Sequence, residues 1–190
     1  MLRVLAIIST LVFVTGCQTF QETKKSGRIS IGEAYSIDPQ VSWRRANRDG
    51  LEIWTVDGPI LQELVFMKAV KDGASLPIKS RQSPENKPRF NSKMSPSEIM
   101  EIVIASLDTG KRGQIKATNL RPMKFGKAQG FRFDISWTNE KGLPYSAIVA
   151  AAKFDETLEL ILYKGDSLHH FAKFHDAVEK MLASIQLIKT

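Results

Sequence analysis

Three histidines near the end of the chain have side chains that could support catalysis or bind a metal. His169, His170 and His175 share one segment with acidic and hydroxyl side chains, namely Asp166, Ser167, Asp176 and Glu179. A zinc site or a Ser/His/Asp arrangement needs these residue types, and it needs them to converge on one point. On a helix of about 100° per residue, His169 points away from the apolar face, and His170 and His175 flank its opposite edges. The spacing therefore predicts solvated or edge positions for all three histidines.

Other sequence patterns of catalysis are absent. The chain has no Gly-x-Ser-x-Gly elbow, no Gly-rich phosphate loop and no His-Glu-x-x-His motif. We therefore predict a protein that is not an enzyme, with no cofactor and no metal site. The alternative is a hydrolase that uses His170 or His175. A hydrolase requires a deep pocket that holds a histidine beside Ser or Asp, whereas a binding module requires an exposed apolar or basic surface near residues 71–93.

The chain has one cysteine, Cys17, and it directly follows an apolar N-terminal segment. A positive charge at Arg3, then the uncharged stretch 4–14, then small residues form the order typical of an export signal. At 1.5 Å per residue, the apolar stretch covers only about half of the ~30 Å hydrocarbon core, so it is too short to span a membrane. Val14-Thr15-Gly16-Cys17 resembles the lipobox of bacterial lipoproteins, in which the cysteine receives a diacylglycerol thioether.

The resemblance implies that residues 1–16 are a signal peptide and that Cys17 is lipidated, which would attach the protein to a membrane. By the sorting rule of Gram-negative lipoproteins, Gln18 in place of Asp implies the outer membrane, with the domain facing the periplasm. Lipidation also removes an unpaired thiol from an oxidising compartment. The alternative is that Cys17 is an ordinary buried thiol.

Removal of the signal peptide takes away only one of the 27 basic residues, Arg3, and none of the 20 acidic ones, so the remaining chain has a net charge of +6. Its length suits one domain with a hydrophobic core. The polar residues 17–27 (CQTFQETKKSG) predict a flexible tether, and 28–190 the single domain. The longest irregular segment is 71–93, which contains three prolines.

The segment 79–132 is rich in basic residues. It contains twelve basic and four acidic residues, which gives it a net charge of +8. They are Lys79, Arg81, Lys87, Arg89, Lys93, Lys111, Arg112, Lys116, Arg121, Lys124, Lys127 and Arg132. One interpretation is attraction to an anionic lipid or an envelope protein, and the other is a solubilising surface. We expect no nucleic-acid binding, because Phe125, Phe131 and Phe133 are better used in the core than for base stacking.

The elements that must position these residues follow from periodicity and turn signals. Short strands are expected at 28–31 and in 35–45, then a hairpin of 51–56 and 60–70 around Asp57-Gly58-Pro59. Ser95-Pro96-Ser97-Glu98 predicts a capped helix to about Leu107. Four strands follow at 114–125, 129–138, 145–154 and 157–163, and an amphipathic helix at 167–185, capped by Asp166 or Ser167, ends the chain.

Two of the four strands have contrasting patterns. The third, with the run Ala147–Ala152, predicts burial on both faces, whereas 129–138 alternates apolar and polar residues. The expected fold is α+β, an antiparallel sheet with flanking helices. This order of elements resembles the PsbP-like sandwich, a group that includes DcrB-like periplasmic lipoproteins. Most members of this group bind partners and are not enzymes, so the resemblance implies a partner-binding role.

Overall fold

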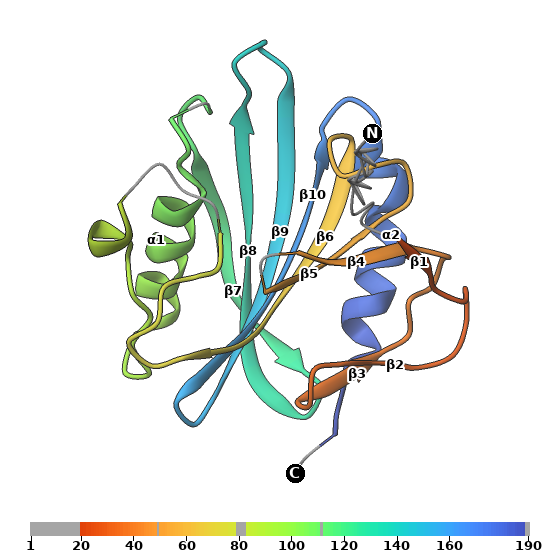
Figure 1. Cartoon of the computed structure of the whole chain (residues 1–190), viewed down its shortest axis with the longest axis horizontal. Coiled ribbons are helices and arrows are strands. Elements are labelled where there is room, and N and C mark those ends of the chain that lie inside the picture. Colours follow the sequence, from red (N-terminus) through yellow and green to blue (C-terminus); the bar gives the residue numbers. More distant parts are fainter. Residues whose placement is uncertain (1–19, 49, 79–82, 111, 189–190) are drawn as a thin grey trace, which may run out of the picture.

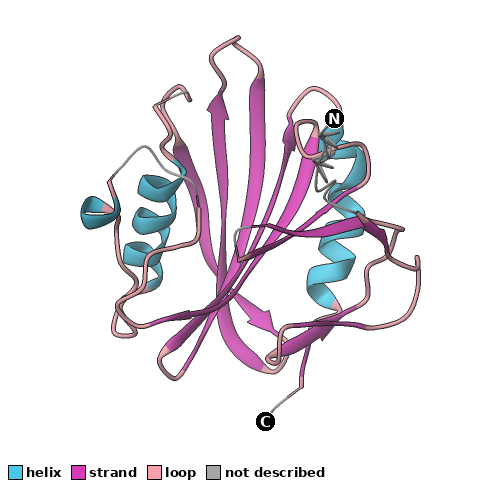
Figure 2. Cartoon of the chain, viewed as in Figure 1, coloured by secondary structure: helices cyan, strands magenta, loops and turns pink. Residues whose placement is uncertain are grey.

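An antiparallel sheet of eight strands runs through the computed structural model, which describes residues 20–48, 50–78, 83–110 and 112–188. Cartoons of the chain are drawn in Figures 1 and 2. In spatial order the strands are β1 (Gln21–Glu22), β4 (Arg44–Arg48), β5 (Leu51–Thr55), β6 (Gln62–Lys71), β10 (Thr157–Asp166), β9 (Pro144–Phe154), β8 (Ala128–Thr138) and β7 (Lys116–Phe125). Every neighbouring pair is antiparallel.

A second, three-stranded sheet and two α-helices complete the described fold. The small sheet has the order β11 (Gln186–Leu187), β3 (Tyr35–Ile37) and β2 (Ile29–Ile31). Helix α1 spans Pro96–Leu107 and helix α2 spans His170–Ala183, and the short 3₁₀ helix η1 spans Pro84–Asn86. The fold is therefore α+β, as the sequence predicts.

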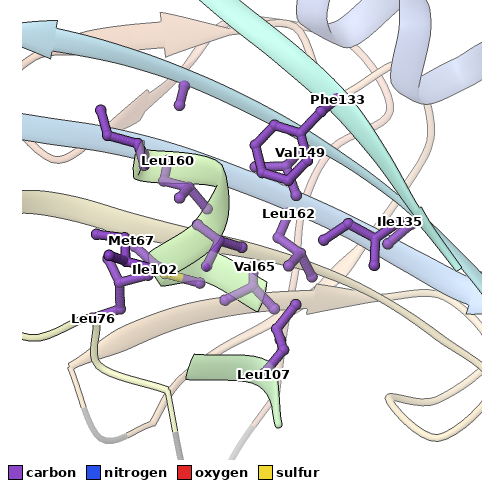
Figure 3. Close-up of a cluster of buried hydrophobic side chains, with 14 of the residues drawn as sticks. Val65, Met67, Leu76, Ile102, Leu107, Phe133, Ile135, Val149, Leu160 and Leu162 are labelled. Carbon is purple, nitrogen blue, oxygen red and sulfur yellow. The ribbon is translucent and has the colours of Figure 1, made fainter. Parts of the chain in front are cut away.

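Two apolar clusters cover opposite faces of the large sheet. One lies between the sheet, α1 and the segment around Leu76 and Phe90 (Figure 3). The other lies between the sheet, α2 and the small sheet. Strand β9 contributes to both, with Ala147, Val149 and Ala151 on the α1 side and Ile148, Ala150 and Ala152 on the α2 side. The prediction of a central strand buried on both faces is confirmed.

Local signals in the sequence form the elements that they predict. Strands β5 and β6 pair as a hairpin around Gly58, which has a φ of +111°. Ser95 and Glu98 form the capping box of α1: the Glu98 N–H donates to Ser95 Oγ at 3.3 Å, and the Ser95 N–H donates to Glu98 Oε2 at 2.7 Å. In β8, Phe131 and Phe133 are buried and Arg132 and Asp134 are half-buried, so the alternation is also confirmed.

Two expectations are wrong in the described residues. Helix α2 begins at His170 instead of Ser167, because β10 extends to Asp166 and pairs there with β9. The side chain of Leu168, expected on the apolar face, is therefore 75% exposed. The tether is not free throughout 17–27, because β1 pairs with β4 and the N–H of Thr23 donates to Trp43 O at 2.7 Å.

Candidate functional site

An open groove lies between the start of α1 and the outer strands β7 and β8. Its volume is about 540 Å³. It is lined by Pro96, Ser97, Leu120, Arg121, Pro122, Gln129, Gly130, Phe131 and Lys153. Carbon atoms dominate this lining, which suits an apolar group of a partner.

A bulge in β7 shapes the outer wall of the groove. The pairing of β7 with β8 shifts register between Thr118 and Arg121, and Asn119 has a φ of +56°. A bulge bends its strand and redirects the side chains beside it. Leu120 follows the bulged Asn119, and its side chain is 37% exposed. The groove therefore presents a leucine at the edge of the sheet instead of burying it.

Two cations stand beside the apolar lining, and both have partners. The Lys153 ammonium donates to Ser92 O at 2.9 Å and to Met94 O at 2.7 Å, which joins the groove to the end of the irregular segment. Arg121 Nη1 lies 3.6 Å from Asp134 Oδ2. These contacts partly satisfy both cations, and the other residues of the lining are uncharged.

Glu98 holds a negative charge near the start of α1. Hydrogen bonds from the backbone and side chain of Ser95, and to a smaller extent the charge of Lys153, hold the pKa of this carboxyl below its ordinary value. The positive end of the helix thus already has its own counter-charge.

The basic residues of 79–132 that the structure describes are not all free. Lys79, Arg81 and Lys111 lie outside the described residues. Arg132 donates two hydrogen bonds to Glu179 on α2, at 2.8 and 2.6 Å.

Strand β7, which carries several of these basic residues, is the last strand of the large sheet. Its side chains Lys116, Pro122 and Lys124 are exposed. Charged side chains and proline on an edge strand prevent pairing with other strands, and this gives these residues a structural role.

His170 lies between two aspartates where β10 meets α2. Its Nδ1 is hydrogen-bonded to Asp166 Oδ2, and its Nε2 lies 3.8 Å from Asp57 Oδ2. Although burial alone would raise the pKa of Asp166, hydrogen bonds from His170 and from the His169 N–H hold it below its ordinary value. No hydrogen bond in the described part of the chain joins His170 to a serine.

His175 borders a hollow of about 560 Å³ with a mixed polar and apolar lining that includes Ser136 and Ser146. Its ring is 3.6 Å from Glu179 and 3.5 Å from Asp176. Ser146 instead shares a hydrogen bond with Ser167, at 2.8 Å. The predicted edge positions are confirmed, since the side chains of His170 and His175 are 20% and 40% exposed. His170 and His175 thus lie near acidic side chains, and His175 borders the same hollow as two serines, but no Ser–His hydrogen bond joins described residues.

Cys17, the predicted lipidation site, lies outside the described residues, so its role stays a prediction. Within the described ranges, no helix has the length and apolar character needed to cross a bilayer. No group of three or more His, Cys, Asp or Glu side chains is placed to hold a metal ion in those same ranges.

Sequence comparison finds no relative: neither a family model nor a curated protein matches the chain. Solved structures show weak similarity. A crystal structure from Bacteroides thetaiotaomicron has a TM-score of 0.49 at 11% identity over 91% of this chain, which spans only 50% of that protein. The solution structure of cyanobacterial PsbP from Synechocystis has a TM-score of 0.49 at 9% identity, covering 94% of this chain and 98% of PsbP.

Two further similar structures come from proteins of different function. The Ran-binding protein Mog1p of Saccharomyces cerevisiae has a TM-score of 0.46 at 8% identity, covering 91% of this chain and 97% of Mog1p. LpqN, involved in cell envelope biogenesis of Mycobacterium tuberculosis, has a TM-score of 0.38 at 9% identity, covering 88% of this chain and 91% of LpqN. Similarity at this level transfers no residue and no function.

The groove was not identified from the sequence. Its outer wall is made by Leu120 and Pro122, and a proline inside a predicted strand is a signal of an edge strand or a bulge. That signal could have marked β7 as the edge. The approach of Pro96 and Lys153 to the same place depends on tertiary packing and has no local signal.

Proposed function

We propose that this protein is a lipid-anchored lipoprotein of the outer membrane that faces the periplasm and binds another envelope protein without catalysing a reaction. The lipobox Val14-Thr15-Gly16-Cys17 supports the anchor. The observation that carries the binding role is the open apolar groove between α1 and strands β7 and β8. It lies beside residues 71–93, where a binding module was expected to expose such a surface.

An apolar segment of a partner protein fits this groove better than a nucleic acid or an anionic lipid held by charge. The aromatic rings next to the basic residues are buried, with Phe125 and Phe133 both 0% exposed, so they are unavailable for stacking on bases. Arg121 and Lys153 already contact other groups of the protein. An apolar side chain, in contrast, would cover Leu120, which is 37% exposed.

The anchor is tested by mass spectrometry of the mature N-terminus. We expect the mature chain to begin at Cys17 and to carry added lipid mass, and we expect Cys17→Ser to accumulate as an unprocessed precursor, because a hydroxyl does not replace the acceptor thiolate. A mature protein that begins elsewhere, or that lacks the lipid mass, would contradict the anchor and with it the localisation.

The groove is tested by cross-linking in whole envelopes. A photoreactive residue at position 120 should give one discrete protein adduct, and Leu120→Asp should abolish capture by a reporter at Gln129. The matched control is Gln114→Asp, which adds the same charge at an exposed position before β7 and outside the groove. Loss of capture in both variants, or a lipid adduct in place of a protein, would contradict the proposal. The hydrolase alternative would be favoured if the protein hydrolysed envelope esters or amides and if His170→Ala or His175→Ala lowered that activity.

A further inference from the structure

Exposed aliphatic side chains gather at the end of the molecule opposite the groove. Ile60 is 79% exposed, Leu61 is 38% exposed and Leu168 is 75% exposed. Ile60 and Leu61 are in the connection between β5 and β6, and Leu168 is in the connection between β10 and α2 (Figure 1, upper right). We call these three residues the apolar tip. Large apolar side chains grouped on a surface indicate a contact with a protein or a membrane.

Hydrogen bonds hold the connections of the apolar tip together. The N–H of Asp166 donates to Leu61 O at 3.1 Å, and the N–H of Ser167 donates to Pro144 O at 2.9 Å. The hydroxyl of Tyr145 donates to Ile60 O at 3.0 Å. The apolar tip is therefore part of a fixed surface built from three neighbouring connections.

The groove and the apolar tip lie near opposite ends of strand β9. The groove is lined by Gln129–Phe131 at the start of β8 and by Lys153 near the end of β9. The tip is next to Pro144 at the start of β9. A surface bound at the tip would therefore leave the groove open at the far end of the sheet.

The predicted anchor limits how far the bilayer can be from this domain. Cys17 precedes Phe20 by three residues, which span at most about 11 Å when fully extended. Phe20 packs under the guanidinium of Arg44, 5.9 Å from the ring centroid, and Arg44 Nη2 donates to Val56 O at 2.9 Å. Val56 directly precedes the turn that leads to Ile60. A lipid on Cys17 would thus bring the bilayer close to the side of the domain that leads into the apolar tip.

The charges around the tip are mostly paired. Lys173 Nζ lies 2.7 Å from Asp57 Oδ2, and Lys164 Nζ lies 3.2 Å from Glu63 Oε1. Glu140 and Lys141, both exposed, follow each other in the β8–β9 hairpin. This end of the molecule offers little net charge, so apolar insertion is a stronger attraction here than charge.

We propose that the apolar tip inserts into the lipid surface to which Cys17 is attached and so orients the domain with its groove facing away from the membrane. The inference rests on the proposed anchor and adds an orientation to it. Two attachments, one covalent lipid and one apolar contact, hold a domain in one orientation better than a lipid alone.

The test uses the full lipidated chain in vesicles. Because Cys17 is the only cysteine and its thiol would carry the lipid, Leu168→Cys supplies one free thiol for an environment-sensitive fluorophore. Ile60→Cys gives a second position in the tip, and Leu120→Cys at the groove is the matched control. The vesicles contain phosphatidylcholine with or without phosphatidylglycerol, and a nitroxide-labelled lipid acts as quencher.

At positions 60 and 168 we expect the fluorophore emission to shift to shorter wavelength, and we expect the nitroxide lipid to quench most of that emission. At position 120 we expect neither the shift nor the quenching. The loss should be the same with either lipid composition and at 1 M salt, where the Debye length is only about 3 Å. Quenching that disappears at high salt would overturn apolar insertion in favour of a charge contact.

Equal, weak quenching at all three positions while Cys17 carries lipid would overturn the orientation and leave the anchor standing. Absence of lipid mass on Cys17 would instead overturn the proposed function. A fluorophore at position 168 that remains exposed to water in vesicles but is shielded from water in native envelopes would overturn the lipid contact and indicate a protein at the tip.

Discussion

The two faces of the large sheet are covered by layers of different chemistry. On the α1 side the buried cluster consists of apolar residues from four strands, α1 and residues 76 and 90. On the α2 side the same sheet also buries Glu52, Gln62 and Glu159, which share the face of Trp54, Phe66 and Ile161 by the two-residue period of a strand. The α1 layer is apolar apart from small polar side chains such as Ser106, and the α2 layer combines packing with buried carboxyl groups.

The buried carboxyl groups on the α2 side are unequal. Glu52 accepts hydrogen bonds from Trp54 Nε1 at 2.9 Å and from Lys68 Nζ at 3.0 Å. Glu159 accepts one, from the N–H of Ala69 at 3.0 Å, and its buried Oε2 has no hydrogen-bond partner among the described residues. Burial, only partly offset by this hydrogen bond and by the charge of Lys68, raises the pKa of Glu159 to about 7.

The difference suggests what each layer does. The groove at the edge of the α1 layer has a mainly apolar lining, so leaving it open exposes few polar groups that need a partner. The α2 layer fixes the small sheet through Tyr35, whose pKa is raised well above its ordinary value by burial and by Glu159 and Glu52. We expect the stability of the α2 layer to fall as pH rises toward 7, and that of the α1 layer, where the pKa of Glu98 is lowered instead, not to fall.

The largest expected effect compares the apolar parts of the two layers. Phe174→Ala in α2 and Phe133→Ala on the α1 side should each lower the free energy of unfolding by about 3–5 kcal/mol, because both rings are buried, at 7% and 0% exposure. His169→Ala, at the exposed start of α2, should stay within about ±0.5 kcal/mol. Denaturant unfolding measures all three variants. A cost for His169→Ala equal to that of Phe174→Ala would refute the assignment of the helix faces.

The second effect tests the polar difference through pH. The pKa of Glu159 is about 7 in the folded protein and near its ordinary value of 4.5 when unfolded. Between these values the folded state keeps a proton that the unfolded state has lost, so the free energy of unfolding falls as pH rises from about 4.5 to 7. The loss is complete above pH 7 and amounts to about 3 kcal/mol.

Glu159→Gln removes the charge and keeps an oxygen that accepts from Ala69. The variant should therefore gain up to about 3 kcal/mol over the wild type at pH 8 and nothing below pH 4.5. Glu156→Gln, at an exposed position in the adjacent turn, is the matched control. Unfolding curves across this pH range give the measurement, and parallel wild-type and Glu159→Gln profiles would remove the polar distinction between the layers.

Much of the fold follows from local patterns, and the site does not. The capping box at Ser95, the hairpin at Gly58 and the alternation around Phe133 are each encoded within a few residues, so the sequence predicts them correctly. The start of α2 was missed because pairing of β10 with β9 continues to Asp166 and competes with helix formation there. Propensity and periodicity are overridden by such tertiary pairing.

The groove and the apolar tip depend on contacts between distant segments. Nothing near Leu120 in the sequence indicates that Lys153 and Pro96 lie beside it. The exposure of Leu168 was missed because its spacing fits the apolar face of a helix that begins two residues later. The charge pattern of 79–132 is visible in the sequence, but the edge position of β7 and the pairing of Arg132 with Glu179 are not.

The smallest expected effect concerns how α1 is held on its side of the sheet. Ser95→Ala removes the side chain that accepts from the Glu98 N–H and should cost about 1 kcal/mol of unfolding free energy. Ser83→Ala is the matched control, because Ser83 precedes η1 without a side-chain capping bond and should change stability by less than about 0.5 kcal/mol. Denaturant unfolding measures the stability of both variants. Cross-linking at position 120 shows whether the groove, which Pro96 lines, still captures a partner. A cost of several kcal/mol for Ser95→Ala would mean that the α1 layer also depends on directional contacts, and the contrast between the two layers would then be wrong.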